Sequence, residues 1–457
     1  MPLPPASLLT GSLRSALWRL SLPAAVSLFG QFLYNAVDAI WLGRLGTVAL
    51  AAAGAAAFVI WMTLALARIV GTGVLAVVAQ AIGGGAELRA RLGATRALLA
   101  ATAMSVASAA FLFGLLPAIF RLMGTSDDVA AAGIVYLQII FAGLPLAFLF
   151  ITLDSIFRAR GDAAAPMWAM LGSLLLNAGL DPVLIFGLGP FPAMGVGGAA
   201  LATVVSRAAG CWLMAGLLVR RRWAVSLLEW ARERHRWPGD SWLMIRIGIP
   251  GSVHGILFSV VYMGLVRFAS PFGTAPVAAL TVGHRVESLA YLICVAQASA
   301  LGAIVGQNLG ARQVERARAA FRLSLVVCLL LLTPLVALFQ LRPDAVVRIF
   351  SSDAEVLRHG ADYLRIIAWS EYFMALEILC GGAFAGAGRT WLPSLVVIPL
   401  TLARLPLAHV LIGPLAARGV WAAICLSSVA KGLALGFVYR VSAWTEGLGL
   451  DAEKAGN

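Results

Sequence analysis

Two polar residues inside the apolar stretch 171–187 are the strongest candidates for chemistry in this chain. Asn177 and Asp181 are four residues apart, so on a helix they share one face. An ionisable group at membrane depth costs about 2.5–3.5 kcal/mol on insertion scales and marks a functional site by default. Pro182 removes a backbone donor directly after the acid, so we expect the helix to bend or open there. The alternative is a buried aspartate neutralised by a local hydrogen bond.

A second carboxylate, Asp38, lies near the end of the first apolar run. Tyr34 shares a helical face with it, and Asn35 lies at the edge of that face. Asp38 is either an ion-binding group or an interfacial carboxylate at the outer mouth of its span. Thr203 follows a run of small residues that lets helices pack closely. A threonine there is more often bonded back to its own helix than bound to a ligand.

Three further acids are candidates for binding a cation or a substrate. Asp154 precedes two arginines by four and six residues, so it either pairs with them at the interface or joins the inward acids. Glu287 lies within a His-Arg-Val-Glu sequence and either pairs with groups elsewhere or lines a cavity. Glu377 lies six residues after Glu371, and this spacing places the two on different helical faces.

The composition places these residues in a membrane protein. Hydrophobic residues make up 61% of the chain and charged residues only 12%, whereas a soluble chain of this length needs far more polar surface. The net charge of +13 comes almost entirely from arginines between the apolar runs. They indicate membrane topology, not a nucleic-acid partner.

Several function classes lack their sequence signals. The 5 cysteines lie within apolar runs, with no close pairing and no metal-ligand spacing, so we expect small buried hydrophobes. No Walker loop, nucleophile elbow or dinucleotide fingerprint occurs. The chain is therefore predicted not to be an enzyme and to hold no cofactor and no tightly bound metal. Its sequence does not indicate an oligomeric state.

Twelve runs are long enough to cross about 30 Å of hydrocarbon at about 1.5 Å per residue. They lie near 17–42, 48–81, 92–118, 130–157, 165–188, 196–219, 243–268, 276–305, 319–341, 356–384, 392–414 and 418–440. Arginine-rich connections alternate with arginine-poor ones, which predicts that both termini lie in the cytoplasm. We expect the chain to span the inner membrane of the cell.

The connection 220–242 divides the chain into two lobes of six helices, 1–219 and 243–457. A shift of 227 residues carries Pro23 onto Pro250, and a shift of 224 applies after the fifth helix. Further pairs at the shift of 227 are Gln80 with Gln307, Gly83 with Gly310, Gly161 with Gly388 and Pro166 with Pro393. Such a parallel repeat predicts two lobes around a central cleft, as in secondary transporters.

The two halves differ at the candidate acids. Under the shift of 227, Asn177 corresponds to Arg404, Asp181 to Ala408 and Asp38 to Leu265. Acid chemistry is therefore concentrated in the N-terminal lobe, which predicts a specialised ion site there.

In this order and spacing, the motifs resemble those of the multidrug and toxic compound extrusion (MATE) transporters over about residues 15–440. The matching pieces are Pro23…Asn35-Ala-Val-Asp38, Val78-Ala-Gln80-Ala-Ile-Gly83, Phe157-Arg-Ala-Arg-Gly161-Asp162…Pro166, Asn177…Asp181-Pro182, Gly195-Val-Gly-Gly-Ala-Ala-Leu-Ala-Thr203, Val305-Gly-Gln307-Asn308-Leu-Gly310 and Phe384-Ala-Gly-Ala-Gly388…Pro393. The resemblance implies export of amphipathic, often cationic, small molecules across the bilayer in exchange for H+ or Na+.

The family resemblance also assigns roles. In the branch with an N-lobe cation site, those roles fall on Asp38, Asn177, Asp181 and Thr203. The family usually has asparagine where this chain has Asp154, so the charge of the site differs here. NorM-type members use acids in the seventh and tenth helices. The predicted seventh helix has none, which resembles the DinF-type branch.

These residues suggest a mechanism of exchange. Two carboxylates close together at low dielectric cannot both ionise cheaply, so Asp38 and Asp181 would share a proton or hold a cation. Na+ would suit both acids together with the oxygens of Asn177 and Thr203, whereas a proton needs only the acids. The resemblance favours H+.

The main alternative within the same superfamily is a flippase for lipids or lipid-linked sugars. Such proteins usually have a markedly cationic cavity for phosphates, and here Arg285 and Arg404 are the only deep candidates. A channel would need a continuous polar lining, which these mostly apolar helices lack.

Overall fold

The computed structural model describes residues 8–221, 223 and 227–450, and in these residues the only regular secondary structure is helical. Ten helices are long and apolar enough to cross a membrane, and two bent helix pairs bring the number of spans to 12. The prediction of twelve membrane helices is therefore confirmed. Contacts between helices divide the chain into two units. Unit 1 is built on Leu22–Gly248, and unit 2 on Leu8–Ser21 and Ile249–Gly449.

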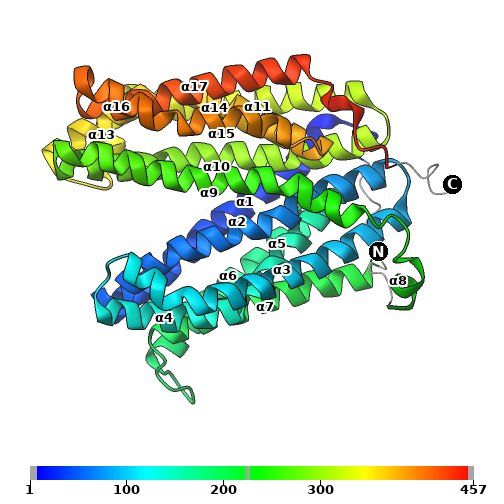
Figure 1. Cartoon of the computed structure of the whole chain (residues 1–457), viewed down its shortest axis with the longest axis horizontal. Coiled ribbons are helices and arrows are strands. Elements are labelled where there is room, and N and C mark those ends of the chain that lie inside the picture. Colours follow the sequence, from blue (N-terminus) through cyan, green and yellow to red (C-terminus); the bar gives the residue numbers. More distant parts are fainter. Residues whose placement is uncertain (1–7, 222, 224–226, 451–457) are drawn as a thin grey trace. The chain divides into compact units, whose positions relative to one another are not determined.

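The helices of unit 1 follow one another with short connections (Figure 1). They are α1 (Leu13–Leu45), α2 (Thr47–Gly83), α3 (Glu87–Leu122), α4 (Asp127–Ala142), α5 (Leu144–Ala159), α6 (Ala164–Phe186), α7 (Val196–Arg220) and the short α8 (Leu227–Glu233). The first residues of α1 belong to unit 2, and the first residues of α9 (Asp240–Ala269) belong to unit 1.

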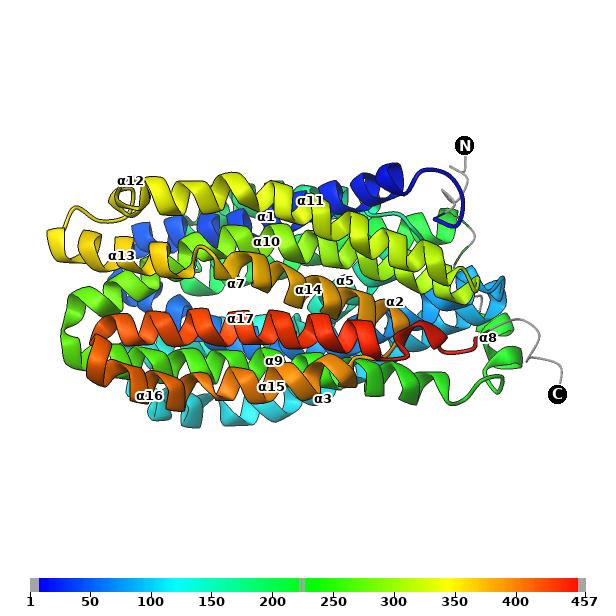
Figure 2. The same cartoon turned by 90° about the horizontal axis from the view of Figure 1, so that it is seen from above.

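Unit 2 continues with the rest of α9 and a second set of helices. They are η1 (Ser270–Phe272), α10 (Thr274–Gly310), α11 (Val314–Leu341), α12 (Pro343–Arg348), α13 (Ala354–Ile367), α14 (Ser370–Ala387), α15 (Trp391–Leu402), α16 (Arg404–Leu415), α17 (Ala417–Val441) and η2 (Trp444–Glu446). Within this unit, α17 lies along α15 and α16 (Figure 2).

The repeat is visible in how the spans bend. The span formed by α4 and α5 bends by 52°, and the span formed by α13 and α14 bends by 55°. The first bend lies at Gly143, and the shift of 227 carries that residue to Ser370, where α14 begins. Near the first bend, Pro145 lacks the N–H that would continue the helix. Corresponding positions of the two halves therefore share a local geometry.

Close helix packing positions the candidate residues of unit 1. α6 and α7 lie side by side, and Gly198 of α7 faces the backbone of Leu184 so closely that a Cβ there would lie 2.4 Å from the Leu184 carbonyl oxygen. In unit 2, a Cβ on Gly419 would lie 2.4 Å from the Leu411 backbone, so α17 and α16 are equally close. Glycine permits both approaches because it has no side chain.

Of the two outcomes expected at Pro182, a bent or an opened helix, the opened helix is not found. α6 stays helical through Pro182 and ends only at Gly187, whose φ is +75°. The helix does not open beside Asp181, because one lost backbone bond is tolerated when a long helix packs along its neighbour. Asn177 and Asp181 therefore stay on one continuous helical face.

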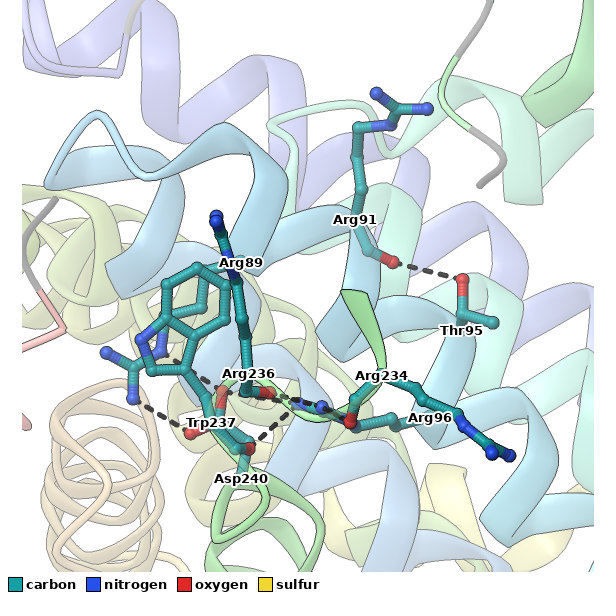
Figure 3. A network of polar contacts seen from close by, with 8 residues as sticks. All are labelled: Arg89, Arg91, Thr95, Arg96, Arg234, Arg236, Trp237 and Asp240. Atoms are coloured by element: carbon teal, nitrogen blue, oxygen red, sulfur yellow. Dashed lines mark hydrogen bonds and ion pairs between the residues drawn. The ribbon is translucent and has the colours of Figure 1, made fainter. Parts of the chain in front are cut away.

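Arginines in each unit hold the segment that leads into a long helix, which is α9 in unit 1 and α1 in unit 2. In unit 1, Arg89 and Arg96 pair with the buried Asp240 at the start of α9, at 2.8 and 3.9 Å. Arg96 also donates to backbone carbonyls of Arg234, Arg236 and Trp237 (Figure 3). These contacts hold the linker after α8 on unit 1.

Unit 2 has a corresponding fastening with different chemistry. Arg316, which corresponds to Arg89 at the shift of 227, donates to the carbonyl oxygens of Leu8, Thr10 and Gly11 just before α1. Asn308 also donates to the Leu8 carbonyl at 3.2 Å. No acid takes part in these contacts, so this fastening uses hydrogen bonds where unit 1 uses a buried ion pair.

Candidate cation site in unit 1

Asp38, Asn177 and Asp181 come together in the interior of unit 1. Asn177 and Asp181 are 0% exposed and Asp38 is 9% exposed. The Asn177 amide donates to Asp181 Oδ1 at 3.2 Å, and the Thr203 hydroxyl donates to Asp38 Oδ2 at 3.3 Å. Asp38 and Asp181 also lie close enough for their charges to interact. Helices α1, α6 and α7 thus bring all four residues into one cluster.

Three oxygen atoms of this cluster have no hydrogen-bond partner. They are Asp38 Oδ1, Asn177 Oδ1 and Asp181 Oδ2, and all three are buried. A buried acceptor without a partner is costly, and two adjacent buried carboxylates repel each other. A proton shared by the acids, or a small cation bound to the three oxygens, would remove both costs. The arrangement is therefore suited to binding and releasing H+ or Na+.

Tyr34 joins the cluster, whereas Asn35 does not. Tyr34 is 1% exposed and its hydroxyl donates to the backbone carbonyl of Thr203 at 3.3 Å. Asn35 is exposed, and its side-chain oxygen accepts from Gln31 at 3.3 Å. One helical position therefore separates a residue beside the acids from a residue on another face.

Arg207 is a member of this region that the sequence analysis missed. Its guanidinium carbon lies 5.1 Å from the centre of the Tyr34 ring, and it donates to Gln31 at 2.6 Å. It also interacts by charge with Asp38. Arg207 lies four residues after Thr203, a spacing that places both on one helical face and could have identified it.

Asp154 lies in an ion pair. Both of its carboxylate oxygens accept from Arg158 Nε at 2.8 Å, one helical turn away. This is the first of the two arrangements that the sequence allowed, the interfacial pair. Thr203 shows the less common of its two alternatives, because its hydroxyl donates to Asp38 instead of to its own helix.

The acids of unit 2 have partners of their own. Glu377 pairs with Lys431 at 2.9 Å, and both side chains are buried. Glu287 accepts from the Tyr363 hydroxyl at 2.7 Å and lies 3.5 Å from His284. The acid on the other face of α14 differs: Glu371 is 1% exposed and neither of its carboxylate oxygens has a partner.

Two further details concern α9 and the cysteines. The predicted seventh span 243–268 contains no carboxylate, as expected, whereas α9 begins earlier, at Asp240, which lies in unit 1 in the ion pair with Arg89. The cysteines have no close spacing in the sequence, but the sulfur atoms of Cys294 and Cys328 lie 3.6 Å apart in the structure. Their separation of 34 residues hid this contact. Both are free thiols.

The described residues contain no group of three or more His, Cys, Asp or Glu side chains that could hold a metal ion. The unit 1 cluster has two such side chains, with an amide and a hydroxyl beside them. Oxygen donors of this kind favour hard cations over zinc or copper.

Comparison with known proteins gives a consistent result. The MatE family model matches residues 23–183 and 250–410, once in each half of the chain. A probable multidrug resistance protein NorM of Thermotoga maritima is 26% identical over 88% of this chain and 86% of its own length. An FAD transporter of Shewanella oneidensis is 28% identical, with 88% of each chain covered.

A solved structure agrees in fold. It is a MOP superfamily transporter from Pyrococcus furiosus, with a TM-score of 0.86, 26% sequence identity, and coverage of 95% of this chain and 96% of that one.

Proposed function

The chain belongs to the MatE family of membrane transporters, and from this premise we propose that it is a secondary antiporter that exports amphipathic, cationic small molecules in exchange for H+. The observation that carries this proposal is the acid pair in unit 1 with its three partnerless oxygens. A transporter without ion exchange has no need for such a costly arrangement. Family members are transporters and not enzymes.

In this mechanism, Asp38 and Asp181 hold the coupling ion together. Asn177 orients Asp181 by donating to it, and Thr203 does the same for Asp38. The ion can drive transport only if it binds one conformation of the transporter better than the other. Protonation of the pair removes the repulsion between the acids, which stabilises the conformation in which α1, α6 and α7 pack most closely around them.

H+ is the proposed ion because the pair can share one proton without further ligands, and Na+ would use the same oxygens. Assignment to the DinF-type branch rests on the absence of an acid from the described interior of α9. We place the chain in the inner membrane with both termini in the cytoplasm, following its arginine-rich connections.

The names of the relatives point to different transported compounds. The NorM relative is named for multidrug resistance and the Shewanella relative for FAD. The proposal of cationic cargo for this chain rests on the family resemblance. The flippase alternative is less well supported, because these relatives are named for multidrug resistance and for FAD transport, not for lipids.

Ethidium efflux from proteoliposomes tests the proposal. The efflux is driven in separate experiments by a pH gradient or by a Na+ gradient, each set so that the ion moves in the direction opposite to the dye. Efflux with the pH gradient alone supports H+ exchange, and efflux with Na+ alone keeps the antiporter and changes the ion. No efflux under either gradient, together with translocation of labelled lipid, would contradict the proposal in favour of a flippase.

A further inference from the structure

The repeat places an arginine of unit 2 where unit 1 has an ion ligand. Arg404 corresponds to Asn177 at the shift of 227, and Ser427 corresponds to Thr203 at the shift of 224. Ala408 corresponds to Asp181 in the same register, and Leu265 to Asp38. Both of these apolar residues are 0% exposed and belong to the apolar core of unit 2. This copy of the site has lost both acids and gained a permanent cation.

The side chain of Arg404 occupies this copy of the site and donates hydrogen bonds to two serines of α17. Arg404 is 3% exposed, with Nε donating to Ser427 Oγ at 2.6 Å and Nη2 donating to Ser428 Oγ at 2.9 Å. The Ser427 hydroxyl in turn donates to the carbonyl of Ile424. Arg404 thus joins α16 to α17, as the ion cluster joins α6 to α7 and α1.

The two copies differ in how completely their polar atoms are paired. In unit 1, one oxygen each of Asp38, Asn177 and Asp181 is buried without a partner. In unit 2, both serine hydroxyls have partners, and no side-chain atom of Arg404 is buried without one. Because the cation in unit 2 is an arginine side chain, the polar atoms of that copy are paired without an ion from solution.

The charge of Arg404 is balanced at a distance. The structure describes no carboxylate in an ion pair with its guanidinium, whose hydrogen bonds go to serines. Glu287 interacts with it by charge while being held by Tyr363. The neighbouring Lys431 is paired with Glu377. Burying an arginine without a direct acid partner carries a desolvation penalty. Such a residue is therefore expected to have a functional role.

We propose that Arg404 is a built-in cation that permanently occupies, in unit 2, the position that the exchanged ion occupies in unit 1. It is a positioning residue: it keeps α16 and α17 in the packing that the ion-bound cluster gives to α6 and α7. Only unit 1 then changes its occupancy during transport. This inference rests on the proposed antiport, because a fixed copy has meaning only if the other copy exchanges an ion.

Chemical rescue tests the proposal. Arg404→Ala removes the cation and leaves space for a small one, so we expect gradient-driven ethidium export to fall by about tenfold or more. Free guanidinium at a non-denaturing concentration should raise the export rate of this variant several-fold. Urea has nearly the same shape without the charge and should restore none. Equal rescue by both compounds, or by neither, would overturn the role of the charge.

A second variant guards against misfolding. Arg404→Met keeps the volume of the side chain and removes its charge, an exchange that often leaves stability unchanged. We expect this variant to fold and to export ethidium about tenfold more slowly. The matched control is Arg348→Met at an exposed arginine of α12, with export unchanged. Wild-type export by a folded Arg404→Met variant would refute the inference while leaving the antiport intact. Absence of export by the wild type would instead refute the antiport.

Discussion

The corresponding sites of the two units show how one fold can carry an exchangeable ion and a fixed one. In unit 1, α6 supplies Asn177 and Asp181, α1 supplies Asp38, and three buried oxygens have no partner. In unit 2, Arg404 donates to Ser427 and Ser428, and the acids are replaced by buried apolar residues. The helices and their contacts are duplicated, and the electrostatics is reversed. Helix packing is therefore compatible with either sign of charge, and a few residues decide which helix pair responds to an ion.

The fastenings of the two units extend this comparison and give the largest expected effect. Asp240→Asn leaves Arg89 and Arg96 without their buried acid, and breaking such a pair costs about 3–5 kcal/mol of stability. Arg316→Gln removes hydrogen bonds to partly exposed carbonyls in unit 2 and should cost only about 1 kcal/mol. Thermal unfolding in detergent measures both. Equal destabilisation by the two substitutions would show that the ion pair contributes no more than the hydrogen bonds.

The next effect concerns ion coupling in unit 1. Asp38→Asn keeps a hydrogen-bond acceptor for Thr203 and removes one of the two charges that hold the ion. We expect gradient-driven ethidium export to fall by about 5- to 150-fold, the range of typical coupling energies. The matched variant in unit 2 is Leu265→Asn, which should reduce stability without abolishing coupling. Retention of coupled export by Asp38→Asn would show that Asp181 holds the ion alone.

A smaller effect on ion affinity is expected at Thr203, and none at Ser427, its counterpart in the repeat. Thr203→Ala removes the donor to Asp38 at 3.3 Å, and the loss of about 0.5–1.5 kcal/mol should weaken ion binding by about 2- to 12-fold. Thr203→Ser should restore it. Ser427→Ala removes an acceptor from Arg404 and should leave ion affinity unchanged. Ion affinity is obtained from the concentration of H+ or Na+ that stabilises the protein against heat. A change of affinity in Ser427→Ala would mean that both copies bind an ion.

The smallest effect is expected at Asp154. Its ion pair with Arg158 lies within one helix and is partly exposed, and such pairs contribute about 0.3–0.5 kcal/mol. Asp154→Asn should therefore change the ethidium export rate by less than about twofold. A loss comparable to that of Asp38→Asn would place Asp154 among the coupling groups after all.

Much of this arrangement could be predicted from the sequence. The lengths of the apolar runs gave twelve spans, and the spacing of four between Asn177 and Asp181 placed them on one face. The repeat register identified Arg404 as the counterpart of Asn177 before any contact was known. These inferences succeed because helical periodicity and hydrocarbon thickness act along the chain itself.

Other features depend on contacts between distant residues and could not be read from spacing. The contact between Cys294 and Cys328 joins two helices. The expected opening at Pro182 failed because propensity along α6 was outweighed by its packing on α7. Tertiary packing, not local sequence, decided each of these.

The most direct test of the exchange in unit 1 is the number of protons released when ethidium binds to the protein in weakly buffered nanodiscs. If substrate and proton favour different states, binding of one must release the other. We predict proton release from the wild-type protein and from Arg348→Met, and none from Asp181→Asn at equal dye occupancy. Proton release that persists unchanged in Asp181→Asn, or wild-type binding that releases neither H+ nor Na+, would contradict it.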